Sequence, residues 1–114
     1  MTVARQRLGT SGERRAARRY EAMGYEVVAR NWRCDDGELD LVVRKGDVLA
    51  FVEVKTRASD RFGHPAEAVT PAKQRRIRRL AGRFCADTGE RARTLRFDVV
   101  AILAGQVEIY EHAF

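Results

Sequence analysis

Apolar positions recur along the chain with two different spacings, and these spacings separate helices from strands. In the segment Ser11–Met23 they recur every three or four residues, as in a helix with one buried face. Ser11 suits the start of this helix and Gly24 the left-handed position after its end. A second helix is predicted from Thr70, another good cap, to the residues before Gly89. The expected inward positions are Glu13, Ala16, Ala17, Tyr20 and Met23 in the first helix and Ile77, Leu80, Ala81 and Phe84 in the second.

Runs rich in β-branched residues predict strands between and after the helices. The expected strands are Tyr25–Arg30, Glu38–Arg44, Val48–Lys55, Thr94–Leu103 and Val107–Tyr110. A polar turn centred on Gly46 joins the second and third strands as a hairpin. Thr56–Pro65 is expected to be a loop, and Arg5 and Arg7 to form a loose N-terminal arm. The order αβββαββ predicts an α/β fold with a mixed central β-sheet flanked by helices.

Composition places the chain among ordinary globular proteins. Its 114 residues fit one domain spanning 1–114, with 45% hydrophobic and 33% charged residues. The longest apolar run, Val99–Ala104, is too short for a membrane span, and the N-terminus lacks a signal-peptide core. Cys34 and Cys85 form no C-x-x-C pair, which favours reduced thiols, with one disulfide as the alternative. We therefore expect a soluble cytoplasmic protein.

The charge balance points to a polyanionic partner. Lys and Arg number 22 against 16 Asp and Glu, giving a net charge of +6. The sequence pI of 10.0 exceeds the value of about 9 at which a nucleic-acid partner is suspected. Charge that serves solubility alone is the alternative.

Two short patterns, Glu38-Leu39-Asp40 and Glu53-Val54-Lys55, place charges on neighbouring strands. A four-residue loop between the strands would set Asp40 opposite Glu53, and a two-residue turn would set it opposite Phe51. Both arrangements put the two carboxylates on one face. A three-residue loop would put them on opposite faces, because a slip of one residue reverses a strand.

Neighbouring carboxylates repel, and a divalent cation relieves that repulsion. Mg²⁺, or Mn²⁺ in its place, commonly takes one or two carboxylates plus water and phosphate oxygens. Asp40 and Glu53 are the predicted ligands, with the backbone carbonyl of Val54 as a further oxygen. Lys55 would orient the attacking water or stabilise developing negative charge. The alternative is a solvated hairpin whose exposed Glu–Lys pair contributes little.

Glu13 is an unusual residue on the inward stripe of the first helix. It either joins the metal site as a third carboxylate or lies partly exposed in the first turn, where the helix dipole favours negative charge. Glu38 either assists the metal or faces solvent. Asp98, in an otherwise apolar strand, either supports Lys55 or an arginine from behind or forms a structural salt bridge. Trp32 either stacks on a base or has a role in the core or at the sheet edge.

Basic residues near the expected site and on the second helix are candidates for phosphate contact, since such contacts dominate nucleic-acid affinity. A solvated cationic face is the alternative. The candidates are Arg57, Arg61, Lys73, Arg75, Arg76 and Arg79. His64, in the loop, is expected at the surface rather than as a general base.

The segments Gly37–Leu41 and Phe51–Arg57 resemble the YraN family of small bacterial proteins. That family is similar to archaeal Holliday junction resolvases and to the restriction-endonuclease-like nuclease superfamily. The superfamily pattern is an Asp on one strand and Glu-x-Lys on the next, matched here by Asp40 and Glu53-Val54-Lys55. A glutamate on the first helix of resolvase-like members matches Glu13. The resemblance covers nearly the whole chain.

This resemblance implies a restriction-endonuclease-like fold and metal-dependent cleavage of a phosphodiester, with branched DNA as a candidate substrate. Glu13, Asp40, Glu53 and Lys55 would be the catalytic residues. Resolvases pair to cut two strands, which suggests a homodimer by analogy. A non-catalytic nucleic-acid-binding protein on the same fold is the alternative, and a protein-interaction adaptor is a third hypothesis that the inward-facing charges oppose.

Overall fold

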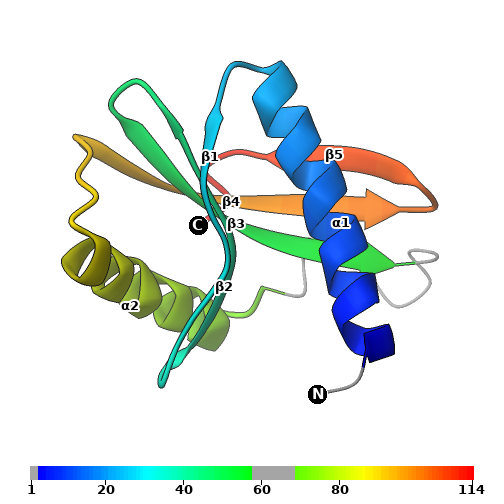
Figure 1. The fold of residues 1–114 in the computed structure, drawn as a ribbon, viewed down its shortest axis with the longest axis horizontal. Helices are drawn as coiled ribbons and strands as arrows, with labels where there is room; N and C mark the ends of the chain where they lie inside the picture. Colours follow the sequence, from blue (N-terminus) through cyan, green and yellow to red (C-terminus); the bar gives the residue numbers. More distant parts are fainter. Residues whose placement is uncertain (1–2, 58–68) are drawn as a thin grey trace.

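The computed structural model describes residues 3–57 and 69–114, and side chains from residue 11 onward. In these residues the elements follow the predicted order of one helix, three strands, a second helix and two strands (Figure 1). Their bounds are α1 Val3–Ala22, β1 Glu26–Cys34, β2 Gly37–Lys45, β3 Val48–Arg57, α2 Pro71–Thr88, β4 Thr94–Leu103 and β5 Gln106–Tyr110.

The strands form one mixed sheet in the order β1-β2-β3-β4-β5. β3 and β4 are parallel, and the other neighbouring pairs are antiparallel. Parallel neighbours need a crossover connection, and α2 supplies it between β3 and β4. The two helices cover opposite faces of the sheet (Figure 1). The predicted mixed sheet flanked by helices is confirmed.

Each face of the sheet has its own apolar core, because side chains alternate along every strand. On the α1 face, Tyr20 packs among residues that include Leu41 and Val100. On the α2 face, the ring of Phe84 meets Phe51 edge to face at 5.9 Å and Trp32 at 5.3 Å. Trp32, on the edge strand β1, is partly buried and packs against this core, which agrees with the predicted core or edge role.

α2 forms as its local sequence predicts. The Thr70 side chain accepts a hydrogen bond from the Lys73 backbone N–H at 3.2 Å, and Pro71 opens the first turn. Gly89 adopts the left-handed conformation, with φ of 78°, and donates its N–H to the Cys85 carbonyl. The buried residues are the predicted ones: Ile77, Leu80, Ala81 and Phe84.

α1 begins earlier than predicted but ends as predicted, just before Gly24, which has a positive φ of 94°. The helix begins at Val3, so Ser11 is an interior residue and the expected loose arm is wrong. A Cβ on Gly12 would lie 2.9 Å from the Thr56 side-chain oxygen, so this glycine serves the close approach of α1 to β3. The sequence predicted a helix start here because serine and glycine, as at positions 11 and 12, are also common at helix N-caps. Met23 is 36% exposed and does not extend the buried stripe.

The β1–β2 hairpin explains two acidic residues that had no predicted role. β1 runs to Cys34, four residues beyond its expected end, and Asp35 and Asp36 form the turn. Asp36 pairs with Arg79 of α2 at 3.3 Å, and Asp35 pairs with Arg83 at 3.0 Å. These ion pairs connect the hairpin tip to α2.

β3 continues through Thr56 to Arg57, so the predicted loop starts later than expected. Arg61 and His64 lie outside the described residues. Across the described part of the chain, neither helix is long and apolar enough to cross a membrane.

Candidate metal centre

The register of β2 and β3 brings the two sequence patterns together. Paired residues run from Lys45 opposite Val48 to Leu41 opposite Val52. Continuing this register places Asp40 opposite Glu53, which is the arrangement predicted for the four-residue loop. One step beyond the last pair, the Asp40 carboxylate accepts the Val54 backbone N–H at 2.9 Å. The Asp40 carboxylate, rather than a backbone carbonyl of β2, thus accepts the hydrogen bond from Val54 just beyond the last paired residues.

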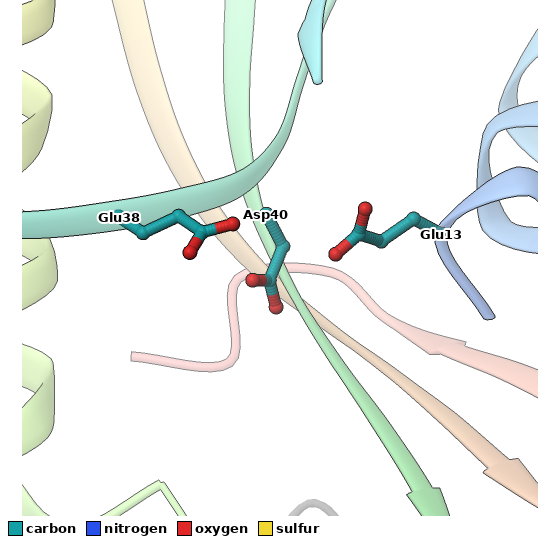
Figure 2. A group of neighbouring side chains, drawn as sticks. All are labelled: Glu13, Glu38 and Asp40. Carbon is teal, nitrogen blue, oxygen red and sulfur yellow. The ribbon is translucent and has the colours of Figure 1, made fainter. Parts of the chain in front are cut away.

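Three carboxylates converge at this point (Figure 2). Glu38 and Asp40 come from β2 and Glu13 from α1, and their nearest ligand oxygens lie within 4.8 Å of one another. Figure 2 shows Glu13 and Glu38 reaching toward Asp40 from opposite sides. Glu38 also forms an ion pair with Arg33, its cross-strand neighbour, at 3.3 Å. We call Glu13, Glu38 and Asp40 the acidic cluster.

Glu13 is the most buried member of the acidic cluster, at 7% exposure. Its Oε2 atom is buried and has no hydrogen-bond partner among the described residues. Burial raises the pKa of the Glu13 carboxyl, as do the charges of Glu38 and Glu53, whereas a hydrogen bond from the Asn31 side chain opposes this rise. Burying a carboxylate oxygen without a hydrogen-bond partner costs free energy, and a bound ligand or a proton would reduce that cost.

The Asp40 carboxyl also has a raised pKa, for the same two reasons as Glu13. Burial raises the pKa of its carboxyl to about 7, the charges of Glu53, Glu13 and Glu38 add to the rise, and the bond from Val54 opposes it. The acidic cluster thus holds more negative charge than its immediate surroundings neutralise at neutral pH. Either a proton or a cation must relieve the repulsion.

Glu53 lies beside the acidic cluster, but its carboxylate is engaged by two lysines. The Glu53 Oε1 atom is 3.5 Å from Lys55 Nζ and 3.2 Å from Lys73 Nζ. Its charge is still close enough to raise the pKa of both Asp40 and Glu13. Metal binding by Glu53 and by the Val54 carbonyl remains a prediction. In the structure, the carboxylate that lies with those of Glu13 and Asp40 is that of Glu38.

Lys55 has an ammonium group whose pKa is lower than usual. Burial lowers the pKa of its ammonium group, and the adjacent Lys73 lowers it further, whereas the Glu53 carboxylate opposes the shift. Lys73 comes from the first turn of α2, so the three charged groups link the end of β3 to that helix. The sequence predicted Lys73 as a phosphate contact, and the structure shows it bound to Glu53.

Asp98 does not support this site. It is fully buried and accepts hydrogen bonds from Arg96 at 2.9 Å and from the Tyr20 hydroxyl at 2.7 Å. Tyr20 lies on the α1 face, whereas Lys55 approaches Lys73 on the α2 face. The predicted support of Lys55 by Asp98 is therefore wrong, and the alternative of a structural salt bridge is confirmed.

The other basic candidates among the described residues lie on α2 and at the end of β3. Arg57 is exposed at the end of β3, and Arg75 and Arg76 are exposed on α2. Arg79 is paired with Asp36 of the hairpin turn. Their contact with phosphate remains a prediction.

Asn31 is the site residue that sequence reasoning missed. It lies in β1 with a positive φ of 49°, and its side chain hydrogen-bonds Glu13. Nothing in the local pattern of β1 connects it with a helix that precedes it in the chain.

The fold and the acidic cluster define a mixed α/β protein with a buried oxygen-rich site at one end of β2 and β3. Residues 12–102 match the model of the Uncharacterised protein family UPF0102, and the chain belongs to this family. A UPF0102 protein from Beutenbergia cavernae is 60% identical over 100 residues, covering 88% of this chain and 85% of the relative. A UPF0102 protein from Rhodococcus jostii is 51% identical over 112 residues, covering 94% and 95%.

Proposed function

We propose that this protein is a metal-dependent nuclease with a restriction-endonuclease-like fold that hydrolyses phosphodiester bonds in nucleic acid, with branched DNA as the candidate substrate. The order of its helices and strands and the Asp40 and Glu53-Val54-Lys55 pattern support this class. One observation carries the proposal: the buried Oε2 atom of Glu13 has no partner among the described residues and lies in a group with Glu38 and Asp40.

The acidic cluster fits a hard divalent cation. Its ligand atoms are carboxylate oxygens, which suit Mg²⁺ or Mn²⁺. The unpartnered Glu13 oxygen offers one ligand, and Asp40, with a pKa near neutrality, offers another. When bound, the cation would supply the positive charge that a phosphodiester needs as negative charge develops on its oxygens.

Lys55 and Lys73 lie beside the acidic cluster, where the proposed cation would bind. Lys55, with its lowered pKa, can hold or release a proton at Nζ beside the cluster and orient a water molecule. Glu53 holds both lysines through its Oε1 atom, so it fixes where Nζ of Lys55 lies. Ligation of the cation by Glu53 itself is the alternative role for this residue.

A substrate panel tests the proposal. The protein is incubated with Mg²⁺ or Mn²⁺ and branched, flapped, single-stranded and duplex substrates. We expect the parent to cleave at least one of them, and Lys55→Met to slow that cleavage by about 100-fold or more. Glu13→Gln should abolish it, whereas Glu21→Gln, on the exposed side of the same helix, should not. Cleavage that survives Glu13→Gln unchanged would contradict the proposal.

Metal binding can be measured without activity. Calorimetric titration of the parent with Mn²⁺ should show a site that Glu13→Gln weakens and Glu21→Gln leaves intact. Equal binding by the parent and by Glu13→Gln would remove the acidic cluster from the proposal.

Nucleic-acid binding without catalysis is the second candidate. It is favoured by the engagement of Glu53 with Lys55 and Lys73, which leaves one predicted metal ligand neutralised. Salt-sensitive binding with no metal-dependent cleavage of any substrate would support this candidate. Absence of binding at moderate salt would leave the adaptor hypothesis.

A further inference from the structure

The outer surface of α1 carries a concentration of arginines that the proposed chemistry does not use. A helix advances about 100° per residue, so the buried positions Ala16, Ala17 and Tyr20 define the inner side. The opposite side presents Arg14, Arg15, Arg18 and Arg19, which we call the α1 arginine face. Three of the four are exposed, and the fourth, Arg15, is half-buried.

These guanidinium groups are not neutralised within the described chain. Arg15 donates a hydrogen bond to the Gly105 carbonyl, which carries no net charge. Among residues 11–57 and 69–114, Arg14, Arg18 and Arg19 have no carboxylate within ion-pair distance. The positive charge of the face is therefore available to a partner.

The α1 arginine face also borders a groove. Three of its arginines, Arg15, Arg18 and Arg19, line an open groove of about 310 Å³ together with Ala22 and Val107 of β5. β5 passes behind α1 in Figure 1, and its residue Val107 borders the groove. The planar guanidinium fork of arginine matches phosphate oxygens better than a lysine does, because it donates two parallel hydrogen bonds.

The composition of the helix favours a nucleic-acid backbone over an anionic membrane. A helix that lies on a membrane inserts an apolar face between the lipids. The apolar side of α1 is already buried against the sheet, with Ala16, Ala17 and Tyr20 at 0% exposure. The exposed side offers charge without an apolar anchor, as expected for a surface that contacts phosphates in water.

We propose that the α1 arginine face and its groove with β5 bind the phosphate backbone of nucleic acid outside the metal centre. The inference rests on the proposed function for the class of ligand, and it adds the surface that holds it. The same helix carries Glu13 on its inner side, so α1 would contact the backbone while contributing a carboxylate to the acidic cluster.

The test measures binding of fluorescent duplex DNA by anisotropy, in EDTA, over a series of salt concentrations. The double variant Arg18→Gln/Arg19→Gln should bind more weakly. The plot of log affinity against log salt should also become less steep by about 2 in the magnitude of its slope, about one for each phosphate that the variant no longer neutralises. The matched control is Arg91→Gln/Arg93→Gln, which removes the same charge from the exposed loop between α2 and β4 and should keep the parent slope. Arg18→Lys/Arg19→Lys preserves the charge and should also keep the slope.

Equal reductions in the two glutamine variants would show that net charge alone drives binding and would overturn the inference. An unchanged slope in Arg18→Gln/Arg19→Gln would overturn it too, as would binding to anionic phospholipid vesicles but not to DNA. The proposed function fails separately. If the parent binds DNA through α1 but cleaves no substrate with Mg²⁺ or Mn²⁺, the binding surface stands and the nuclease does not.

Discussion

α1 and α2 are both arginine-rich helices that cover opposite faces of one sheet, yet they satisfy their polar groups differently. On α2 the buried stripe is wholly apolar, and three of the five outer arginines, Arg78, Arg79 and Arg83, have an acidic or aromatic partner among the described residues. Arg83 pairs with Asp35 and Asp87, and the Arg78 guanidinium lies 4.6 Å from the centre of the Phe97 ring. On α1 the buried stripe contains Glu13, one of whose oxygens lacks a partner, and the outer arginines have no acidic partner among the described residues.

The difference separates a helix that stabilises the fold from one whose unsatisfied groups indicate ligands. A protein that folds alone pairs its buried polar groups, and departures from this rule gather at functional sites. The buried side of α2 follows the rule, whereas the buried side of α1 departs from it at Glu13. The following predictions test that contrast.

The largest expected effect comes from truncating the central ring of the α2 stripe. Phe84→Ala removes a ring that packs against Phe51 and Trp32, and should lower the free energy of unfolding by about 3–5 kcal/mol. Urea unfolding followed by circular dichroism measures this. Phe84→Leu, which keeps most of the volume, is the control and should cost much less. A decrease below about 1 kcal/mol for Phe84→Ala would show that α2 is not held by this stripe.

On α1 the corresponding structural interaction is polar. Tyr20→Phe removes the hydroxyl that donates to the buried Asp98, and should lower the free energy of unfolding by about 1.5–3 kcal/mol, as for other hydrogen bonds to charged groups. The same urea unfolding measures it. Tyr110→Phe removes a hydroxyl bonded to Glu108 at the surface and should leave stability unchanged. Equal effects of the two changes would contradict the role of Tyr20.

The acidic cluster should destabilise the metal-free protein, so that removing a charge stabilises it. The pKa of Asp40 is raised from 3.8 to about 7, which means that folding penalises its carboxylate form. The penalty is complete above pH 7, shrinks as the pH falls toward 3.8, and vanishes below that value. Asp40→Asn keeps an acceptor for the Val54 N–H and should gain about 1–2 kcal/mol at pH 8 in EDTA.

Parallel unfolding curves at pH 8 and at pH 4 measure this gain, which should be small at the lower pH. Added Mg²⁺ should stabilise the parent but not Asp40→Asn, because only the parent retains the full ligand set. A variant that is less stable than the parent at pH 8 in EDTA would show that the carboxylate repulsion is already relieved.

The smallest expected effect comes from the ion pairs on the outer side of α2. Arg79 and Asp36 are 3.3 Å apart, but both side chains are about half exposed or more. Because exposed ion pairs contribute little, Arg79→Gln should change the free energy of unfolding by less than about 1 kcal/mol. Thermal unfolding at low and high salt measures it. A larger decrease that high salt removes would show that the hairpin tip depends on α2 for its position.

The sequence alone determined the elements and their order, because the spacing of apolar residues and the caps are local properties of the chain. Thr70, Pro71 and Gly89 predict the ends of α2, and the alternating patterns predict the strands to within a few residues. Even the possible registers of Asp40 and Glu53 follow from counting residues between them. The local signal at Ser11 and Gly12 was ambiguous, and the predicted helix start there was wrong. The helix begins at Val3, and Gly12 instead allows the close approach of α1 to β3.

Only the tertiary structure decided which charges meet. It placed Glu38 with Glu13 and Asp40, and it set Glu53 beside them in ion pairs with Lys55 and Lys73. These groups come from two helices and two strands, and their separations depend on sheet twist and helix packing between distant parts of the chain. Spacing along a strand decides only the side on which a carboxylate emerges, whereas packing decides which charge it then meets.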